Sequence, residues 1–181
     1  MEICPELRTD RLVLEPLEPF HGALLYEGLS DAGLYDFIPE SPPTDAAALS
    51  ARYSRLSRRR SPNGRDIWLN WAVRAGADGN YVGYVQATIA ENHEAAVGFV
   101  LFRAAWGAGY GTEAVGRMIE HLDEIVGVRV VRGYVDVRNT RSIALLERLR
   151  FERVAVERSA TAAGDGLAAE AEYVRRIVPN S

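Results

Sequence analysis

The segment from 106 to 112, which reads Trp-Gly-Ala-Gly-Tyr-Gly-Thr, has the composition of an anion-binding turn. It follows an apolar segment and precedes one with helical periodicity. Glycines in such a turn permit positive φ angles and allow a ligand to approach the backbone closely. The free N–H groups of the turn and of the first helical residues form a concave site, and the helix dipole also favours an anion there. The pattern indicates a phosphate or pyrophosphate site, although a tight turn without a ligand has the same glycine spacing.

Two common phosphate-binding motifs do not fit this turn. A P-loop ends in Gly-Lys-Ser/Thr, but all 21 positive charges of this chain are arginines and lysine is absent. A dinucleotide fingerprint has the spacing G-x-G-x-x-G, whereas the spacing here is G-x-G-x-G. Asp136 does end a strand about 25 residues further on, but it follows a poor fingerprint.

A second polar pair, Asn139 and Ser142, opens the predicted helix Arg141–Leu149. Short polar side chains at this position accept hydrogen bonds from free helical amides. Helix capping therefore explains each residue taken alone. The pair indicates a ligand site only in combination with the glycine turn.

The elements that must position these residues follow from hydrophobic periodicity and turn signals. Their order fits neither a doubly wound sheet nor an all-β fold. It predicts an α/β (α+β) fold, a mixed sheet with helices on both faces, and the length of 181 residues predicts one domain over residues 1–181. The predicted elements are the strand Arg11–Leu17, the helix Phe20–Leu29, a helix from Asp45 to near Arg60, the strands Ile67–Arg74, Tyr81–Ala90 and Ala95–Phe102, the helix Thr112–Val126 with Gly127 as its C-cap, the strand Arg129–Val137, the helix Arg141–Leu149, and the strands Phe151–Arg158 and Glu170–Val178 around a tip at Ala160–Ala169.

Composition narrows the partners and the compartment. A net charge of −4 argues against a dedicated nucleic-acid binder, and no apolar run approaches the roughly 20 residues that span a bilayer. The N-terminus lacks the cationic start and apolar core of a signal peptide. Cys4 stands alone, so it forms no internal disulfide or cysteine metal cluster, and we expect it in a mobile terminus. We expect a cytoplasmic protein without a metal; a homodimer is left open.

Together, the two motifs resemble those of the GNAT superfamily of N-acetyltransferases. Trp106–Ala114 is similar to its acetyl-CoA pyrophosphate loop, and Asn139-x-x-Ser142 with Leu149–Phe151 is similar to its second cofactor motif. The opening segment Leu7–Leu17 resembles the RimJ/RimL-like branch. This resemblance covers essentially the whole chain. It implies a mostly antiparallel sheet in which a central cofactor strand splays from its neighbour.

The same resemblance implies acetyl-CoA as the cosubstrate and assigns residues to it. Phe99 and Leu101 would offer backbone groups to the pantetheine arm and the acetyl carbonyl, with the Leu101 N–H as an oxyanion donor. Asn139 would hydrogen-bond the pantetheine, and Ser142 would lie close to the sulfur and support the leaving thiolate. The pyrophosphate would be held by Trp106, Gly107, Ala108, Gly109, Tyr110, Gly111 and Thr112.

Three departures from the family pattern bear on the site. Trp106 replaces the usual Arg or Gln, so the loop must depend on backbone amides. Arg150 replaces the glycine before Phe151, which affects the geometry of that turn. Leu146 stands where many members carry a general-acid tyrosine, which makes Ser142 the nearest hydroxyl.

Glu94, at the start of the cofactor strand, is the first candidate for the catalytic base. Counting back from Trp106, however, the matched position is Ala95, so Glu94 could point to the opposite face. A solvated charge at a strand end is the simpler explanation of Glu94. The same holds for the other candidates, which are His93, Glu170 and Glu172.

The acceptor is predicted to be a primary amine that attacks the thioester directly. Neutralising a lysine amine at pH 7 costs about 4.6 kcal/mol, against about 1 to 1.4 kcal/mol for an α-amine. A site without a strong base therefore favours a protein N-terminal α-amine, in line with the RimJ/RimL-like resemblance. The alternatives are a small amine of the aminoglycoside or polyamine type, and a non-catalytic acyl-CoA-binding module.

Aromatic and basic residues of the first half could line the acceptor cleft. Trp68 and Trp71 are three apart, so they face opposite ways on a regular strand. We expect His21 and His121 to be surface or boundary residues. Tyr35 and Phe37 are further cleft candidates, and the arginines near the second helix form a solvated face or, alternatively, a dock for an acidic partner; they are Arg52, Arg55, Arg58, Arg59 and Arg60.

Overall fold

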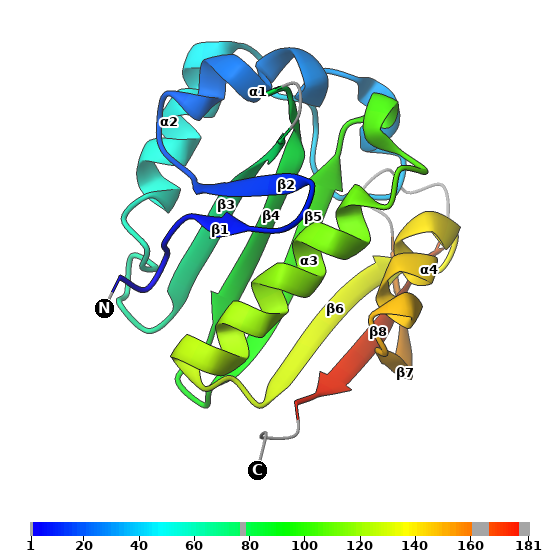
Figure 1. Cartoon of the computed structure of the whole chain (residues 1–181). Helices are drawn as coiled ribbons and strands as arrows, with labels where there is room; N and C mark the ends of the chain where they lie inside the picture. Colours follow the sequence, from blue (N-terminus) through cyan, green and yellow to red (C-terminus); the bar gives the residue numbers. More distant parts are fainter. Residues whose placement is uncertain (1, 77–78, 161–166, 178–181) are drawn as a thin grey trace.

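A computed structural model describes residues 2–76, 79–160 and 167–177. Within these residues, eight strands form one sheet in the order β1-β2-β3-β4-β5-β6-β8-β7 (Figure 1). Only β5 and β6 pair in parallel; the other neighbours are antiparallel. The elements are β1 (Leu7–Arg8), β2 (Leu12–Pro16), α1 (His21–Leu29), η1 (Ala32–Leu34), α2 (Ala46–Leu56), β3 (Ile67–Ala75), β4 (Tyr81–Ile89), β5 (Glu94–Leu101), η2 (Arg103–Ala105), α3 (Tyr110–His121), η3 (Leu122–Val126), β6 (Val130–Asp136), α4 (Thr140–Arg148), β7 (Glu152–Ala160) and β8 (Leu167–Arg176).

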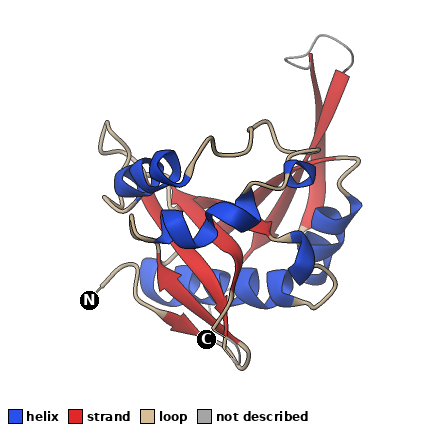
Figure 2. Ribbon diagram, turned by 90° about the horizontal axis from the view of Figure 1, so that it is seen from above, coloured by secondary structure: helices blue, strands red, loops and turns tan. Residues whose placement is uncertain are grey.

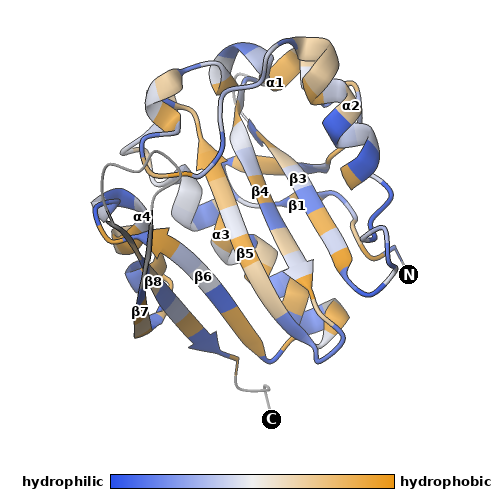
Figure 3. Cartoon of the chain, turned by 180° about the vertical axis from the view of Figure 1, so that it is seen from behind, coloured by the Kyte–Doolittle hydropathy of each residue, from blue (hydrophilic) through white to orange (hydrophobic). Residues whose placement is uncertain are grey.

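The helices cover both faces of the sheet, which confirms the predicted mixed α/β architecture. Helices α3 and α4 pack on one face over the larger hydrophobic core, which includes Trp71 and Met118. Helices α1 and α2 pack on the other face over a smaller core around Leu25 and Tyr53. The second pair covers only the upper part of its face, so stretches of β3 to β6 lie below it without a helix (Figure 3).

The element boundaries follow from local signals, with some differences from the sequence prediction. Asp45 caps α2 through a hydrogen bond from the Ala48 N–H of 2.7 Å, but the helix ends at Leu56 rather than near Arg60. Helix α3 begins two residues early and passes into the π-helical turn η3, which Gly127 ends with a φ of 70°. The N-terminal strand is a hairpin of β1 and β2.

The long hairpin of β7 and β8 projects away from the rest of the molecule (Figure 2). The central part of its predicted tip, residues 161–166, lies outside the described residues, as do residues 77–78 of the predicted turn between β3 and β4 and residue 178 at the predicted strand end. Among the described helices, none is long and apolar enough to cross a membrane.

The N-terminal segment is part of the core, and the prediction of a mobile Cys4 is wrong. Cys4 is 2% exposed, and its thiol donates to the Asn70 carbonyl at 3.7 Å. The prediction that His21 and His121 are surface or boundary residues is also wrong, since both are buried. His21 bonds Glu15 at 3.2 Å, and His121 donates to the Ile3 carbonyl at 2.9 Å.

Candidate active site

The two central parallel strands separate at the end where the polar motifs lie. The ladder between β5 and β6 runs only from the pair Glu94 and Val130 to the pair Val97 and Gly133. Beyond it, β5 continues to Leu101 and β6 continues to Asp136 without pairing with each other. The predicted splay of the cofactor strand is therefore present in the fold.

Strand β5 directs the backbone groups of alternate residues into this gap. The Phe102 N–H donates to the Val82 carbonyl on the β4 side at 2.8 Å. Because neighbouring residues of a strand point their N–H and C=O groups to opposite sides, those of Leu101 and Phe99 face β6. The Leu101 carbonyl accepts a hydrogen bond from the Trp106 indole at 2.9 Å. The Leu101 N–H faces the same side, toward the gap.

A cavity of about 160 Å³ occupies the gap. Its walls come from β5, from β6, from the start of α4 and from the loop before α2. Several predicted site residues meet here: Phe99, Asn139 and Ser142 line it, together with Leu146, the residue at the usual tyrosine position, and Glu170.

The glycine turn has the backbone conformation that its sequence predicts. Gly107 and Gly109 have φ angles of 79° and 80°, and Gly109 is the N-cap of α3. A Cβ on Gly107 would meet no atom within 4 Å, so the backbone there is open to a ligand. Gly111 serves packing instead, because a Cβ at this position would lie 2.7 Å from the Leu145 side chain of α4.

The hairpin of β1 and β2 holds this turn through charged and polar contacts. Arg11 Nε donates to Glu113 Oε2 at 2.7 Å, and Arg11 Nη1 donates to the Ala108 carbonyl at 2.9 Å. The Thr9 hydroxyl donates to Glu113 Oε1 at 2.5 Å. Burial raises the pKa of Glu113, but the bonds from Thr9 and Arg11 outweigh it and leave the pKa below its ordinary value. A paired carboxylate thus stands in the first turn of α3, beside the proposed anion site.

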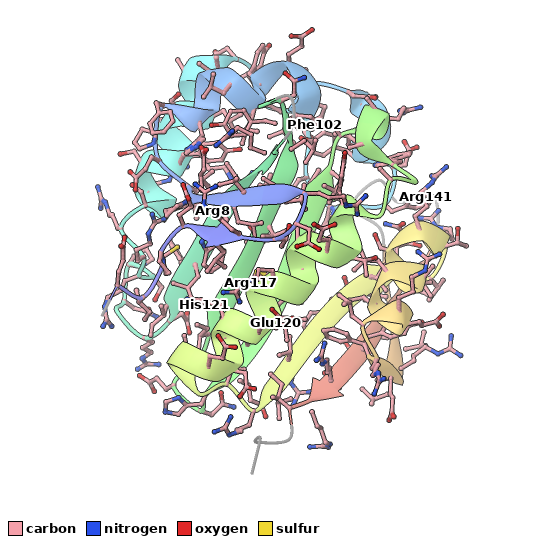
Figure 4. All side chains as sticks on the ribbon, in the orientation of Figure 1. Arg8, Phe102, Arg117, Glu120, His121 and Arg141 are labelled. Carbon is pink, nitrogen blue, oxygen red and sulfur yellow. The ribbon has the colours of Figure 1, made fainter. Side chains whose placement is uncertain are left out.

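Two arginines that the motif comparison missed lie over the Trp106 ring. The Arg141 guanidinium is 4.3 Å from the ring centroid, and the Arg103 guanidinium is 5.5 Å from it. Arg141 lies at the start of α4, close to the turn after β5 (Figure 4). Arg103 is also paired with Asp31 at 2.9 Å, so Arg141 is the residue that brings positive charge to the loop position where the sequence has Trp106 in place of an Arg. The adjacent Asn139 motif was the only sequence signal for Arg141.

Asn139 is the N-cap of α4, and its side-chain oxygen accepts from the Ser142 N–H at 3.1 Å. Asn139 also lines the cavity, and within the described residues no hydrogen bond from its NH₂ group is present. The turn after α4 keeps its geometry with Arg150 in the left-handed region, at a φ of 62°. The following Phe151 N–H donates to the Leu146 carbonyl at 3.0 Å.

Glu94 is not among the residues that line the cavity. Its carboxylate accepts from Arg132 Nε at 2.8 Å, and this hydrogen bond lowers the pKa of Glu94. Glu172 is bound to the same arginine at 2.6 Å. Glu170 is the one predicted base that lines the cavity. The geometry therefore favours Glu170 over Glu94, whose low pKa makes it a weak base.

The remaining candidates divide between core and cleft. Trp71 is fully buried, and its indole donates to the Pro5 carbonyl at 2.8 Å. The register of β3 with β4 is regular from Ile67 to Val73. Trp68 therefore faces the opposite side of the sheet from Trp71, as predicted. Phe37 lines the cavity in the gap, and Tyr35 lines a second cavity beneath α2.

The arginines near α2 do not form a uniformly solvated face. Arg52 donates to Glu40 at 2.7 Å. Arg59, with a side chain only 18% exposed, bonds Glu18 at 3.0 Å.

The donor groups of the site fit acetyl-CoA. The positive-φ turn at the N-terminus of α3 offers amides to a pyrophosphate, and the gap offers strand N–H groups to an amide-bearing arm. When bound, acetyl-CoA supplies an activated acetyl group as a thioester. A parallel strand pair that opens beside such a turn defines the class of acetyl-CoA-type acyltransferases.

Comparison with known proteins identifies the family. A family model described as an acetyltransferase (GNAT) domain matches residues 11–152, and the chain belongs to this family. An uncharacterized N-acetyltransferase p20 of Bacillus licheniformis is 35% identical over 63 residues, which span about a third (35%) of each protein.

Solved structures share the fold at low sequence identity. RimL, a ribosomal L7/L12 alpha-N-protein acetyltransferase in complex with coenzyme A, has a TM-score of 0.82 at 17% identity, covering 95% of this chain and 98% of its own. The ribosomal-protein-S5-alanine acetyltransferase of Vibrio fischeri has a TM-score of 0.80 at 13% identity, covering 94% and 96%. Both neighbours show that the fold extends over nearly the whole chain.

Proposed function

We propose that this protein transfers the acetyl group of acetyl-CoA to a protein N-terminal α-amine in the cytoplasm. One observation carries the proposal. The gap between β5 and β6 opens onto a cavity that Asn139, Ser142 and Glu170 line. The amide-rich turn at the start of α3 packs through Gly111 against the side chains of Leu101 and Leu145, on the strand and the helix that flank the gap. The pantetheine arm of the cosubstrate, the reacting carbonyl and the acceptor amine can therefore meet in this gap.

In the proposed mechanism, the chain's own groups position and polarise the reactants. The Gly107–Thr112 amides hold the pyrophosphate, and the Arg141 guanidinium adds charge from the edge of the loop. The Leu101 N–H donates to the carbonyl oxygen as negative charge develops on it. The amine nitrogen forms the new C–N bond, the C–S bond breaks, and the Ser142 hydroxyl donates a hydrogen bond to the departing thiolate.

Glu170 accepts the proton that the amine loses on attack. Leu146 holds the place of the usual tyrosine and lines the cavity without offering a proton. Because an α-amine is partly neutral at pH 7, a solvent-accessible carboxylate at the cavity rim suffices for this acceptor. A lysine ε-amine would need about 3 kcal/mol more to lose its proton. This difference supports an α-amine rather than a polyamine as acceptor.

Amine-dependent release of the CoA thiol tests the proposal. Peptides with a free α-amine should release thiol faster than the same peptides with a blocked N-terminus and an internal lysine. Ser142→Ala should lower kcat with little change in the KM for acetyl-CoA. Release with small amines alone would favour the small-molecule alternative. Tight acetyl-CoA binding without release by any amine would leave an acyl-CoA-binding module.

A further inference from the structure

A second cavity, of about 290 Å³, lies between α2, the loop that precedes α2, and the sheet. Tyr53 of α2 and Asn70 of β3 line it, together with Tyr84 and Gln86 of β4. Tyr84 and Gln86 also line the cavity between β5 and β6, so the two cavities share part of their wall. The volume corresponds to a group of roughly ten heavy atoms, since one water occupies about 30 Å³.

The Tyr53 hydroxyl is an orphan in this wall. Tyr53 is 2% exposed, and its hydroxyl oxygen is buried with no hydrogen-bond partner among the described residues. A buried hydroxyl left in this state is destabilising, because the hydrogen bonds it made to water in the unfolded chain are not replaced. Burial also raises the pKa of Tyr53, so the hydroxyl stays protonated and can donate. A polar group of a bound ligand would supply the missing partner.

Two side-chain amides, those of Gln86 and Asn70, line the same cavity as the Tyr53 hydroxyl. Gly98 of β5 pairs with Gln86 of β4, and Gln86 pairs with Asn70 of β3, so the three residues form one row on the same face of the sheet. Neither amide side chain hydrogen-bonds any part of the chain that the structure describes. Gly98 leaves room for the row, because a Cβ there would lie 3.0 Å from Gln86 Nε2. Two strand spacings make the row about 10 Å long.

Two arginines stand in the wall of the cavity, and one of them, Arg52, is paired with a carboxylate. Arg52, which also lines it, donates twice to Glu40, at 2.7 and 3.4 Å. Arg55 is turned back onto its own helix, where it donates to the Ala51 carbonyl at 3.4 Å. Apart from Arg55, the polar groups left to meet a ligand are neutral hydroxyls and amides, which pair best with a neutral hydroxyl or carboxamide.

We propose that the cavity of Tyr53, Asn70, Tyr84 and Gln86 selects acceptors that carry a neutral hydroxyl or carboxamide about 10 Å from the reacting amine. This inference rests on the proposed transfer reaction and adds the acceptor's chemistry to it. In a peptide, an extended chain covers about 10 Å in three residues, so the selected side chain belongs to the second or third residue.

The test compares acceptors that differ only in this group. The peptides Ala-Asn-Asn-Ala-Trp and Ala-Leu-Leu-Ala-Trp form the pair. Amine-dependent thiol release is measured for the wild type, for Tyr53→Phe and for Tyr35→Phe. Tyr35→Phe is the matched control, because Tyr35 lines the same cavity but its hydroxyl already donates to the Leu29 carbonyl at 2.9 Å.

We expect the wild type to favour the amide member of the pair by about tenfold or more in kcat/KM, as one buried hydrogen bond allows. Tyr53→Phe should reduce that preference severalfold without lowering the melting temperature, and Tyr35→Phe should keep the preference. Equal use of both members, or a preference that Tyr53→Phe does not change, would overturn the inference while transfer stands. No thiol release from any amine would overturn the transfer reaction itself, and this inference with it.

Discussion

The contact between Arg11 and Glu113 gives a sharp prediction about acetyl-CoA binding. Glu113 places a carboxylate in the first turn of α3, where the proposed pyrophosphate site lies. Arg11 neutralises it with a hydrogen bond of 2.7 Å and also holds the Ala108 carbonyl of the loop. Replacing Arg11 by Ala should leave a bare negative charge facing the bound anion and weaken binding.

The magnitude follows from Coulomb's law. A carboxylate about 7 Å from a phosphate charge repels it by about 0.6 kcal/mol at an effective dielectric constant of 80 and by about 2.4 kcal/mol at 20. The Arg11 side chain is 49% exposed, so solvent screens much of this repulsion. We therefore expect the lower half of the range, which corresponds to a roughly 3- to 10-fold increase in the Kd for acetyl-CoA.

Titration calorimetry of a double-mutant cycle measures the effect. Glu113→Gln alone should bind acetyl-CoA as well as the wild type or better, because the amide keeps the acceptor for Thr9 while it removes the charge. Arg11→Ala with Glu113→Gln should return to within about twofold of the wild type. The deficit of Arg11→Ala should shrink at high salt. Arg8→Ala is the matched control, since this arginine of the same hairpin pairs with Glu6 (Figure 4).

Two results would refute this reasoning. Arg11→Ala could bind acetyl-CoA as tightly as the wild type, which would place the anion elsewhere. The double variant could remain as weak as Arg11→Ala, which would mean that loop geometry rather than charge is lost.

Three further predictions concern stability and reactivity. Burial raises the pKa of Glu15, but bonds from Tyr81, Arg74 and His21 lower it to about 2. The stabilising contribution of Glu15, on the order of 1 to 3 kcal/mol, is therefore complete above about pH 4.5 and lost toward pH 2. In urea titrations, the difference in unfolding free energy between the wild type and Glu15→Gln should shrink over that range. A constant difference would contradict the hydrogen-bond network around Glu15. Burial raises the pKa of Cys4 to about 11, which lowers the fraction of reactive thiolate. A disulfide reagent at pH 8 should therefore label the native thiol about 100-fold more slowly than the thiol of the urea-unfolded chain. Equal rates would show that the thiol is not buried. Arg150 has a φ of 62°, in the left-handed region that strains a residue with a side chain. Arg150→Gly should therefore leave stability unchanged or raise it by about 1 kcal/mol, whereas Arg150→Val should lower it by about 1 to 2 kcal/mol. Equal melting temperatures for the two variants would show that the backbone at this position is not strained.

Local signals in the sequence predicted the parts of the site that the backbone builds. Gly107 and Gly109 have the positive φ angles that their residue type permits, and Asp45 and Asn139 cap the helices they precede. The splay of β5 from β6 followed from the family resemblance rather than from periodicity. Hydrophobic pattern alone does not say where a ladder between two strands ends.

Contacts between distant segments were beyond sequence reasoning. Arg132 is 38 residues from Glu94, and no local pattern predicts that it pairs with this carboxylate, the first candidate for the base in the sequence. The predictions for Cys4 and His121 rested only on their local positions, a chain terminus for Cys4 and a helix for His121. Their burial depends on partners 66 and 118 residues away, the carbonyls of Asn70 and Ile3. Only the folded sheet brings these residues together.

Hydrogen exchange with and without acetyl-CoA tests the central claim most directly. If the gap and the glycine turn hold acetyl-CoA through backbone amides, saturating ligand should slow exchange at Phe99 and Leu101, across Gly107–Thr112 and at Ser142. Amides of α2 around Tyr53 should change little, because the proposed acetyl-CoA site does not include the cavity beneath α2. Protection confined to α2, or no protection in the gap at saturating acetyl-CoA, would contradict the account.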